Sequence, residues 1–524
     1  MARLLALPLL IALPASAVAA EHDWPSYNRS LMSDRYVSLD QISRANVAKL
    51  KVACTYDTGQ KVSFQTGPLV VDGTLYATTE KDIFAIDATT CKERWRTAET
   101  YEAAGPLKVN RGAAYLDGRL FRGTQDGRVL AYDAKTGKRL WETRIADPKL
   151  GETVPAAPIA WSGLVFVGNA GGDNYGVKGR MYALVAATGK IAWEFYLVPK
   201  DKTDAAHQGA RSWGNPDDIP IAGGATWTSY SLDPARGLLY VPGGNPAPDF
   251  KAGLRPGDNL FTNSVVVLDA KTGTYKAHYS LVPEDFHDWD VSAAPALFTD
   301  KAGKRLLAAA PKDGHLYGID LDNGKRLYRT KITTVSNETA PLTATGTRFC
   351  PGTQGGVEWN GPAYSPQTNL VYTGAVDWCS TVRVADDAKV RSVSQGQPWS
   401  GSADEKEMFG KMDPQSRWAG WLYASDAATG ARKWRFKSEA PLMSGVTPTA
   451  GGLLFLGDMR GRVYAFDAAS GKSLWTHDLD GAIGGGVISY EAAGKQRIAV
   501  ASGMTSPIWP TADVTGKIVV FALE

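Results

Sequence analysis

DAKTGKRLW, residues 133–141, is the stretch of sequence that decides the fold, because related phrases recur along the whole chain. Six further copies, each closed by Trp or Tyr, begin at Asp87, Val185, Asp269, Asp320, Asp426 and Asp467. In most copies an Asp opens a turn, a Gly takes a positive φ, and the chain then returns to an extended conformation. The closing aromatic side chain has a flat face that can be buried between stacked sheets. The repeat therefore predicts one β-hairpin per copy.

A second hairpin signal precedes most copies, as in PLVVDGTLYATT (68–79), where Asp-Gly separates alternating apolar residues. Two hairpins make four antiparallel strands, which is one blade of a β-propeller. Seven copies are visible, and the 106-residue gap between Asp320 and Asp426 is long enough to hold an additional blade, whose strands we expect in 359–379. These observations predict an all-β, eight-bladed β-propeller with four-stranded antiparallel blades.

The two ends of the chain are expected to meet in one blade. The last strand, KIVVFALE (517–524), has no hairpin partner after it, so we expect it to pair with a strand near Val52. No linker divides the chain, which predicts a single domain over residues 21–524. Two polar, turn-rich stretches, 195–225 and 380–416, are predicted to be functional loops.

Residues 1–20 have the pattern of a signal peptide, with a positive residue at Arg3, an apolar run (4–13) and a small-residue cleavage site (17–20). Later segments do not reach the about 18 uninterrupted apolar residues of a membrane-spanning helix, so we expect a periplasmic protein without a membrane span. The net charge of +3, with scattered Lys and Arg, gives no indication of nucleic-acid binding. The four cysteines favour disulfides, and no Cys-x-x-Cys-His motif for covalent haem is present.

Six segments carry a more specific signal, and they occur in this order: VNRGAAYLDG (109–118), GNAGGDNYGVKGRMYAL (168–184), GGATWTSYSLDPARGLLYVPGGNPAPDF (223–250), GDNLFTNSVVVLDAKTG (257–273), HDWDVSAAPAL (287–297) and APKDGHLYGID (310–320). In this order they resemble segments of the methanol and ethanol dehydrogenases that depend on pyrroloquinoline quinone (PQQ). The resemblance covers nearly the whole chain after residue 20. It implies oxidation of an alcohol, with PQQ and Ca²⁺ as cofactors.

The resemblance also implies roles for single residues. Asp290, in HDWDV, matches the catalytic base, and a carboxylate suits a group that accepts the alcohol proton while hydride leaves the carbinol carbon. Trp227 matches the indole that stacks on the quinone plane, Lys312 a cation facing the quinone oxygens, and Arg111 a cation that pairs with a cofactor carboxylate. Further cofactor contacts are implied for Gln65 (where a Glu is common), Trp359 and Asn360. Each residue also has an ordinary interpretation, as a turn residue, core aromatic or solvated charge, and Asp288 is the next candidate for the base.

The implied metal ligands are Asn245, through its amide oxygen, and Asp290, with Ca²⁺ polarising the quinone carbonyl. The metal-binding Glu of the family is absent from GNAGGDNYGVKG. Its place falls on Asn174 in an ungapped match and on Asp173 if one residue is inserted. We expect Asp173 to approach the metal, because a carboxylate serves Ca²⁺ better than an amide. Lanthanide-using relatives carry an extra Asp where this chain has Ser292, which indicates Ca²⁺.

The cysteines both follow and depart from the family. Cys350 and Cys379 resemble a structural disulfide of the methanol dehydrogenases, and we expect Cys54 and Cys91 to form a second one. Two adjacent cysteines of the family are missing, and Gly105-Pro106 stands in the corresponding place. This departure affects how the cofactor is covered and how fast electrons leave it.

Together these features predict a periplasmic, PQQ- and Ca²⁺-dependent alcohol dehydrogenase that passes electrons to a separate acceptor, a soluble cytochrome c. A non-catalytic propeller scaffold, like the outer-membrane assembly lipoproteins with the same Trp-containing repeat, is the alternative from another class. A member that binds PQQ without metal activation is the third possibility. The polar set Asp290, Asn245, Lys312 and Trp227 separates the enzyme from the scaffold, which has no reason to assemble it. The sequence does not specify which alcohol is oxidised.

Overall fold

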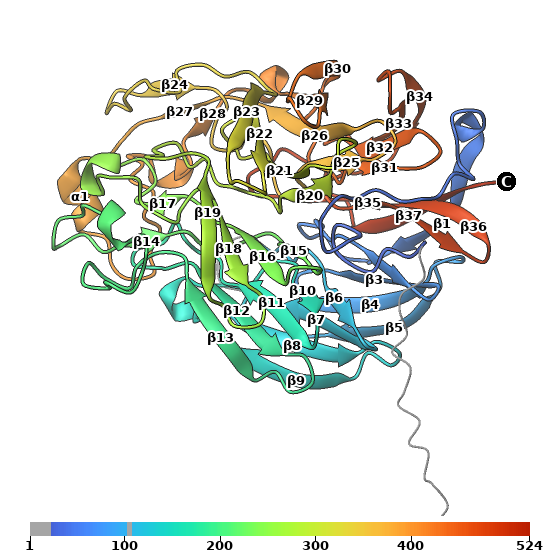
Figure 1. Cartoon of the computed structure of the whole chain (residues 1–524), viewed down its shortest axis with the longest axis horizontal. Coiled ribbons are helices and arrows are strands. Elements are labelled where there is room, and N and C mark those ends of the chain that lie inside the picture. Colours follow the sequence, from blue (N-terminus) through green and yellow to red (C-terminus); the bar gives the residue numbers. More distant parts are fainter. Residues whose placement is uncertain (1–21, 102–106) are drawn as a thin grey trace, which may run out of the picture.

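The computed structural model of the chain describes residues 22–101 and 107–524. Eight four-stranded antiparallel sheets follow one another around a ring, from blue on the right of Figure 1, through green on the left, to red on the right again. The predicted all-β, eight-bladed propeller is therefore confirmed. The expected signal peptide (1–20) and the Gly105-Pro106 pair lie outside the described residues.

Seven blades are each formed by one continuous part of the chain. The strands of the first four are β2 (Leu69–Val71), β3 (Thr74–Thr78), β4 (Asp82–Asp87) and β5 (Glu93–Ala98); β6 (Ala114–Leu116), β7 (Arg119–Gly123), β8 (Arg128–Asp133) and β9 (Arg139–Arg144); β10 (Ile159–Trp161), β11 (Leu164–Gly168), β12 (Arg180–Val185) and β13 (Ile191–Tyr196); and β15 (Ser231–Asp233), β16 (Leu238–Pro242), β18 (Ser264–Asp269) and β19 (Tyr275–Ser280). The strands of the next three are β20 (Ala296–Thr299), β21 (Arg305–Ala309), β22 (His315–Asp320) and β23 (Arg326–Lys331); β25 (Ala363–Ser365), β26 (Leu370–Asp377), β29 (Ala419–Asp426) and β30 (Arg432–Ser438); and β31 (Thr447–Pro448), β32 (Leu453–Gly457), β33 (Arg462–Asp467) and β34 (Ser473–Asp478). In each of these blades the turn between the third and fourth strands carries one copy of the repeat.

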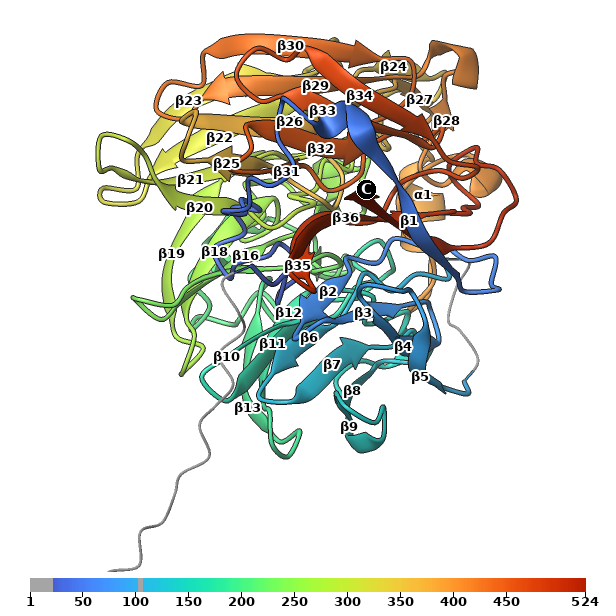
Figure 2. The same ribbon diagram turned by 90° about the vertical axis from the view of Figure 1, so that its right-hand side faces the viewer.

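The eighth blade combines both ends of the chain. β35 (Val487–Ala492), β36 (Lys495–Ser502) and β37 (Lys517–Leu523) pair in order, and β1 (Leu50–Asp57) adds the outer strand, with Val52 opposite Phe521. Figure 2 shows β1 in blue beside these dark red strands. The predicted closure of the ring near Val52 is confirmed.

The expectation that 359–379 starts an additional blade is wrong. β25 and β26, which lie in this stretch, pair with β29 and β30, the strands of the copy at Asp426. The gap between copies is long because an insertion follows β26. The blade without a copy of the repeat is the one that closes the ring.

The two predicted loops contain only short elements. In and near 380–416, three short strands form a sheet: β24 (Thr347–Phe349), β27 (Ser380–Val382) and β28 (Lys411–Met412). The helix α1 (Asp387–Arg391) is capped by Asp386, whose side chain accepts a hydrogen bond from the backbone N–H of Lys389. In 195–225, β14 (Ala222–Gly223) pairs with β17 (Pro246–Ala247). The short 3₁₀ helices are η1 (Val47–Lys49), η2 (Pro148–Leu150), η3 (Ala210–Ser212), η4 (Ala252–Leu254), η5 (Glu405–Glu407) and η6 (Gln415–Arg417). Among the described residues, no helix has the length and apolar character needed to cross a membrane.

Neighbouring blades are joined by the aromatic residue of one repeat and the turn of the next. The indole N–H of Trp95 donates to the carbonyl of Ala134 at 3.1 Å, and its ring packs on Gly137, where a Cβ would overlap the ring. Gly137 has a φ of +71°, which also favours glycine. The hydrogen bond to an Ala carbonyl of the next copy recurs at Trp141, Trp193, Tyr328 and Trp434. Five turns of the repeat are thus docking sites for the aromatic residue of the preceding copy.

Apolar side chains fill the space between neighbouring sheets. Five of the six residues of β4 are buried, whereas β9, a fourth strand, has no fully buried residue. Middle strands are covered on both faces by neighbouring blades, so their sequences are nearly continuous apolar runs. Fourth strands form the outer surface of the ring, and their residues alternate in exposure.

Both predicted disulfides are confirmed. Cys54 in β1 is bonded to Cys91 in the first turn of the repeat, so this bond ties the closing blade to the first blade. Cys350 is bonded to Cys379 across a separation of 29 residues. The second bond joins the two ends of the segment that holds β25 and β26.

The docking of Trp95 gives a first prediction. Gly137→Ala should lower the free energy of unfolding by about 1–3 kcal/mol more than Gly118→Ala, because only the former adds overpacking to the cost of a positive φ. Gly118 is the matched control, with a φ of +75° and open space where a Cβ would lie. Chemical denaturation of both variants measures the difference. Equal losses would show that the Trp95 ring does not depend on the glycine.

The disulfides give a second prediction. Replacing Cys54 and Cys91 together by Ser should lower the free energy of unfolding by about 4 kcal/mol on the loop-entropy model, because the bond closes a loop with a sequence separation of 37. Peptide mapping without reducing agent should recover both pairs. Free thiols in either pair would contradict the assignment.

Candidate active site

The predicted site residues lie in loops at one end of the ring. In an antiparallel meander, the loop between strands two and three and the loop to the next blade lie at the same end of the sheet. Asp173 follows β11 and Lys312 follows β21, which are second strands, whereas Trp227 and Asp290 precede first strands. The turns of the repeat join strands three and four, so they lie at the opposite end. The fold therefore separates the docking turns from the candidate site.

Asp290 is held by two donors. The ammonium group of Lys312 lies 2.7 Å from Asp290 Oδ2, and the backbone N–H of Asn245 donates to Asp290 Oδ1 at 2.9 Å. Gly244 permits this approach, because a Cβ there would lie 2.9 Å from the same oxygen. All three of these polar residues are buried. The arrangement keeps a carboxylate and an ammonium group in contact and out of water.

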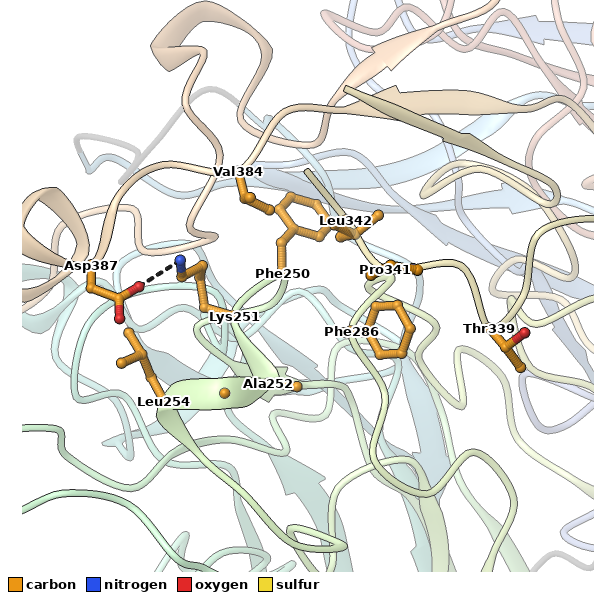
Figure 3. Close-up of a pocket in the computed structure, with 11 residues that line it drawn as sticks. Phe250, Lys251, Ala252, Leu254, Phe286, Thr339, Pro341, Leu342, Val384 and Asp387 are labelled. Carbon is orange, nitrogen blue, oxygen red and sulfur yellow. Dashed lines mark ion pairs between the residues drawn. The ribbon is translucent and has the colours of Figure 1, made fainter. Parts of the chain in front are cut away.

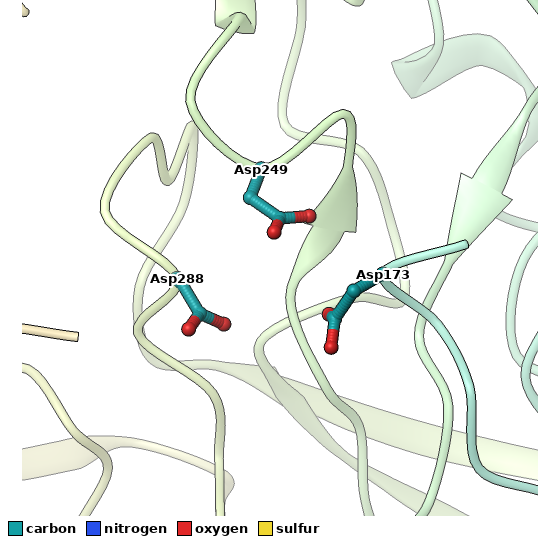
Figure 4. A group of neighbouring side chains, drawn as sticks. All are labelled: Asp173, Asp249 and Asp288. Carbon is teal, nitrogen blue, oxygen red and sulfur yellow. The ribbon is translucent and has the colours of Figure 1, made fainter. Parts of the chain in front are cut away.

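A second group of carboxylates lies beside this pair. The carboxylate oxygens of Asp173, Asp249 and Asp288 approach to within 4.8 Å of one another, and Figure 4 shows the three side chains pointing toward a common space. Neither oxygen of Asp249 has a hydrogen-bond partner, and neither does Oδ2 of Asp288. Lys312 lies 3.6 Å from that Asp288 oxygen. Three convergent carboxylates with free oxygens can bind a hard cation.

Asn174 does not join this group. Its side-chain amide donates to the carbonyl of Gly151 at 2.9 Å, and its backbone forms a bridge with Pro398. Of the two residues that compete for the place of the missing Glu, the structure brings only Asp173 to the other carboxylates.

The charges of the site affect one another strongly. Burial and, to a smaller extent, the carboxylate of Asp290 raise the pKa of Asp173, Lys312 and a hydrogen bond from Asn245 oppose them, and the resulting pKa is about 6. Burial and neighbouring carboxylates also raise the pKa values of Asp249 and Asp288 well above the ordinary range. Burial alone would lower the pKa of Lys312, but the nearby carboxylates outweigh it and raise this pKa. The site thus holds more negative charge than its single ammonium group can neutralise.

Aromatic faces and a second cation lie next to the carboxylates. The guanidinium carbon of Arg111 lies 4.7 Å from the ring centroid of Trp227 and 5.1 Å from that of Trp359. The ammonium group of Lys312 lies 5.4 Å from the Trp227 ring. Arg111 is buried, its Nε has no hydrogen-bond partner, and burial lowers its pKa to about 10. Trp227 therefore has both predicted cations over its ring.

The remaining predicted contacts are engaged to different degrees. The amide of Gln65 donates to Ser63 at 2.8 Å, but its carbonyl oxygen is buried without a partner. Asn360 is fully engaged by the protein: its oxygen accepts from Tyr27 and Arg35, and its nitrogen donates to the carbonyls of Met443 and Gly484. The indole of Trp359 also donates to Gly484, at 2.6 Å. Asn360 fixes the N-terminal segment to the centre of the ring, and Gln65 keeps a free acceptor.

Sequence reasoning missed two acidic residues. Asp249 lies four residues after Asn245 in the same segment, and Glu358 directly precedes Trp359. Glu358 Oε1 has no partner, and burial raises the pKa of Glu358 to about 7, with Lys312 and Arg111 opposing the shift and Asp290 adding to it. The available signal was an acidic residue within an apolar, Gly- and Pro-rich stretch, where a charge needs a partner.

A surface pocket lies over the loops that carry two of the carboxylates. Phe250 follows Asp249, Phe286 precedes Asp288 by two residues, and both line the pocket with Leu254 and Val384. Figure 3 shows the ion pair between Lys251 and Asp387 at its edge, at 2.6 Å. The pocket walls are mainly apolar side chains.

Comparisons with known proteins agree with the fold. The family model described as glucose/ethanol/alcohol dehydrogenase, beta-propeller domain, matches residues 24–345, and a model of outer membrane protein assembly factor BamB matches residues 419–517. The chain is 32% identical to the dehydrogenase subunit of the quinone alcohol dehydrogenase of Komagataeibacter europaeus, over 92% of this chain and 71% of that protein. It is 31% identical to the quinohemoprotein alcohol dehydrogenase of Comamonas testosteroni, over 92% of this chain and 72% of that protein.

Solved structures give the same result. The quinohemoprotein alcohol dehydrogenase ADHIIG of Pseudomonas putida HK5 superimposes with a TM-score of 0.86 at 28% identity, covering 96% of this chain and 80% of that chain. A europium-containing methanol dehydrogenase superimposes with a TM-score of 0.84 at 28% identity, covering 96% of this chain and 98% of that chain. The family model matches more than half of the chain, and the relatives exceed 30% identity along nine tenths of it. The chain therefore belongs to the PQQ-dependent alcohol dehydrogenases, the β-propeller family of quinoprotein oxidoreductases.

Proposed function

We propose that this oxidoreductase is a periplasmic, PQQ- and Ca²⁺-dependent alcohol dehydrogenase that passes electrons to a separate acceptor, such as a soluble cytochrome c. The observation that carries the proposal is the buried pair of Asp290 and Lys312, 2.7 Å apart, beside three convergent carboxylates. A scaffold gains nothing from such a set, because burying unneutralised charge costs stability.

The residues fit a hard cation. Asp173 is half-buried beside the buried Asn245, whose side chain is hydrogen-bonded to its carboxylate. Carboxylate and amide oxygens are the ligands that Ca²⁺ prefers. We therefore propose Asp173, Asn245 and Asp290 as metal ligands, and leave Asn174 with its partner Gly151.

The residues also fit a flat, multiply charged anion such as PQQ. Trp227 and Trp359 offer aromatic faces, and Arg111, which lies over both, has a buried donor without a partner. The unpartnered oxygen of Gln65 is a further polar group available to a ligand. We propose that Arg111 and Lys312 neutralise the cofactor, and that Trp227 provides the surface on which its rings lie.

The reaction then follows from the residues around Asp290. When bound, PQQ supplies the two-electron acceptor and Ca²⁺ the Lewis acid for this chemistry. Asp290 accepts the hydroxyl proton of the alcohol at its carboxylate. Lys312 holds the Asp290 carboxylate in place, and the backbone N–H of Asn245 fixes its orientation. Burial of the set keeps water from competing for the proton.

Two further parts of the proposal depend on the sequence. The 524 residues contain no Cys-x-x-Cys-His motif, which favours an acceptor on another protein. The N-terminal pattern of residues 1–20 favours export to the periplasm, where both pairs of cysteines can form disulfides.

Asp290→Asn should abolish dye-linked alcohol oxidation and leave PQQ bound, because the variant retains the shape of the side chain but not the proton acceptor. Loss of a general base costs roughly 10²–10⁴-fold in rate. Rates with an alcohol panel measure the first effect, and the absorbance of bound PQQ measures the second. A variant that keeps more than about a tenth of the wild-type rate would have lost less activity than removal of a general base should cost. The base would then lie elsewhere, and Asp288 is the next residue to replace.

Asp173→Ala should raise the Ca²⁺ concentration needed for half-maximal activity at least about tenfold, since charge count determines much of the affinity for this ion. Asn174→Ala is the matched control, because its amide bonds to Gly151 and not to the carboxylates. Titrating both variants with Ca²⁺ in the presence of PQQ ranks the two residues. The reverse ranking would place Asn174 at the metal and contradict the register seen in this loop.

A further inference from the structure

The mechanism leaves two buried carboxylates unused. Asp249 is fully buried and neither of its oxygens has a hydrogen-bond partner. Asp288 is 2% exposed, and its Oδ2 has no hydrogen bond. A buried carboxylate without a partner is strongly destabilising, so both residues need a cation that offsets this cost.

The nearby protein cations are committed elsewhere. Lys312 is closer to Asp290, at 2.7 Å, than to Asp288, at 3.6 Å. Arg255 is next to Asp249, but it donates to the backbone carbonyls of Pro248, Asp249 and Asp285 and to the side chain of Asn259. In the described part of the chain, no Lys, Arg or His nitrogen forms an ion pair with the Asp249 carboxylate.

The geometry of the three side chains suits one ion. Their oxygens lie within 4.8 Å of one another, and they come from three separate loops, after β11, after β16 and before β20. Two oxygens that bind the same Ca²⁺ at about 2.3–2.6 Å can be at most about 5 Å apart. Figure 4 shows that Asp249 and Asp288 face the same space as Asp173.

We propose that Asp249 and Asp288 are further metal ligands and hold the cation together with Asp173, Asn245 and Asp290, whose carboxylate also keeps its contact with Lys312. The ligand is a hard, multiply charged cation, with Ca²⁺ as the ion of the proposed function. The inference rests on that proposed function only in placing a cation at Asp173. It adds two ligands and assigns the unpartnered oxygens a role.

The proposed metal site then has acidic ligands that do not stand at the position where lanthanide-using relatives carry their additional Asp. Ser292, where lanthanide-using relatives have an Asp, supplies no carboxylate, and its hydroxyl donates to the carbonyl of Val357. Asp249 and Asp288 supply the charge from other loops. When they bind an ion in their deprotonated forms, the three carboxylates contribute a charge of −3, and Lys312 offsets the charge of Asp290. Coulomb attraction grows with the charge of the ion, so La³⁺ is a useful probe of this set.

Calcium binding tests the inference without catalysis. Full-length protein, with and without PQQ, is titrated with CaCl₂ by calorimetry after treatment with a chelator. Asp249→Asn and Asp288→Asn should each raise the Kd for Ca²⁺ at least about tenfold, since charge count sets much of the affinity, and the loss for La³⁺ should be larger. Asp117→Asn, at an exposed turn residue, is the matched control and should bind as the wild type does. Asp249→Glu, which keeps the charge, should restore most of the affinity.

Thermal melting separates lost binding from lost folding. Without added cation, Asp249→Asn should melt at or above the temperature of the wild type, because the amide removes the cost of burying an ionisable carboxyl group without a partner. Added Ca²⁺ should raise the melting temperature of the wild type and of Asp117→Asn, but not that of Asp249→Asn.

Wild-type affinity for Ca²⁺ in both Asn variants would overturn the inference, and so would a wild-type protein that binds no Ca²⁺. Loss of affinity in Asp249→Asn that Asp249→Glu does not restore would also count against it. If the variants lose Ca²⁺ but the loaded wild type oxidises no alcohol, the metal site stands and the proposed function fails.

Discussion

The contact between the aromatic residue of one repeat and the turn of the next is the interaction on which the rest of the structure depends. Trp95 shows its parts: a flat face on Gly137 and an N–H that bonds to Ala134. The flat contact requires a residue without a Cβ, and the hydrogen bond satisfies a buried donor. Five junctions between blades repeat this contact around the ring, and the closing blade takes its outer strand from β1.

The ring explains where charge can be buried. Apolar packing between blades stabilises the fold, and the docking turns lie at the end opposite to the site. The loops at the other end are therefore free to carry groups that cost stability, such as Asp249 and Asp288. Lys312 lies against Asp290, and the remaining carboxylates are the ones for which we propose a bound cation. The site is a local excess of negative charge held on a rigid frame.

The same repeat occurs in proteins of different function, so the blades alone do not identify an enzyme. The match to an outer-membrane assembly factor over residues 419–517 concerns blades that contribute little to the carboxylate group. Trp227, Arg111 and Lys312 come from other blades, and they combine aromatic faces with buried cations. This combination, beside acidic oxygens, is what an anionic, planar cofactor and a metal require together.

Local signals in the sequence determined the hairpins and the closure near Val52, because turns and alternating strands depend on neighbouring residues; the predicted total of eight blades was right, although its eighth blade was placed in 359–379 and not at the closure. Motifs also identified Asp290 and Lys312, and the structure brings them into contact. The sequence could not show which hairpin the strands in 359–379 join, since pairing between distant strands depends on the ring. Nor could it distinguish Asp173 from Asn174, because only the folded loop directs Asn174 to Gly151. The role of Asp249 was decided by tertiary structure alone: its burial and its lack of a partner exist only where three loops from different blades meet.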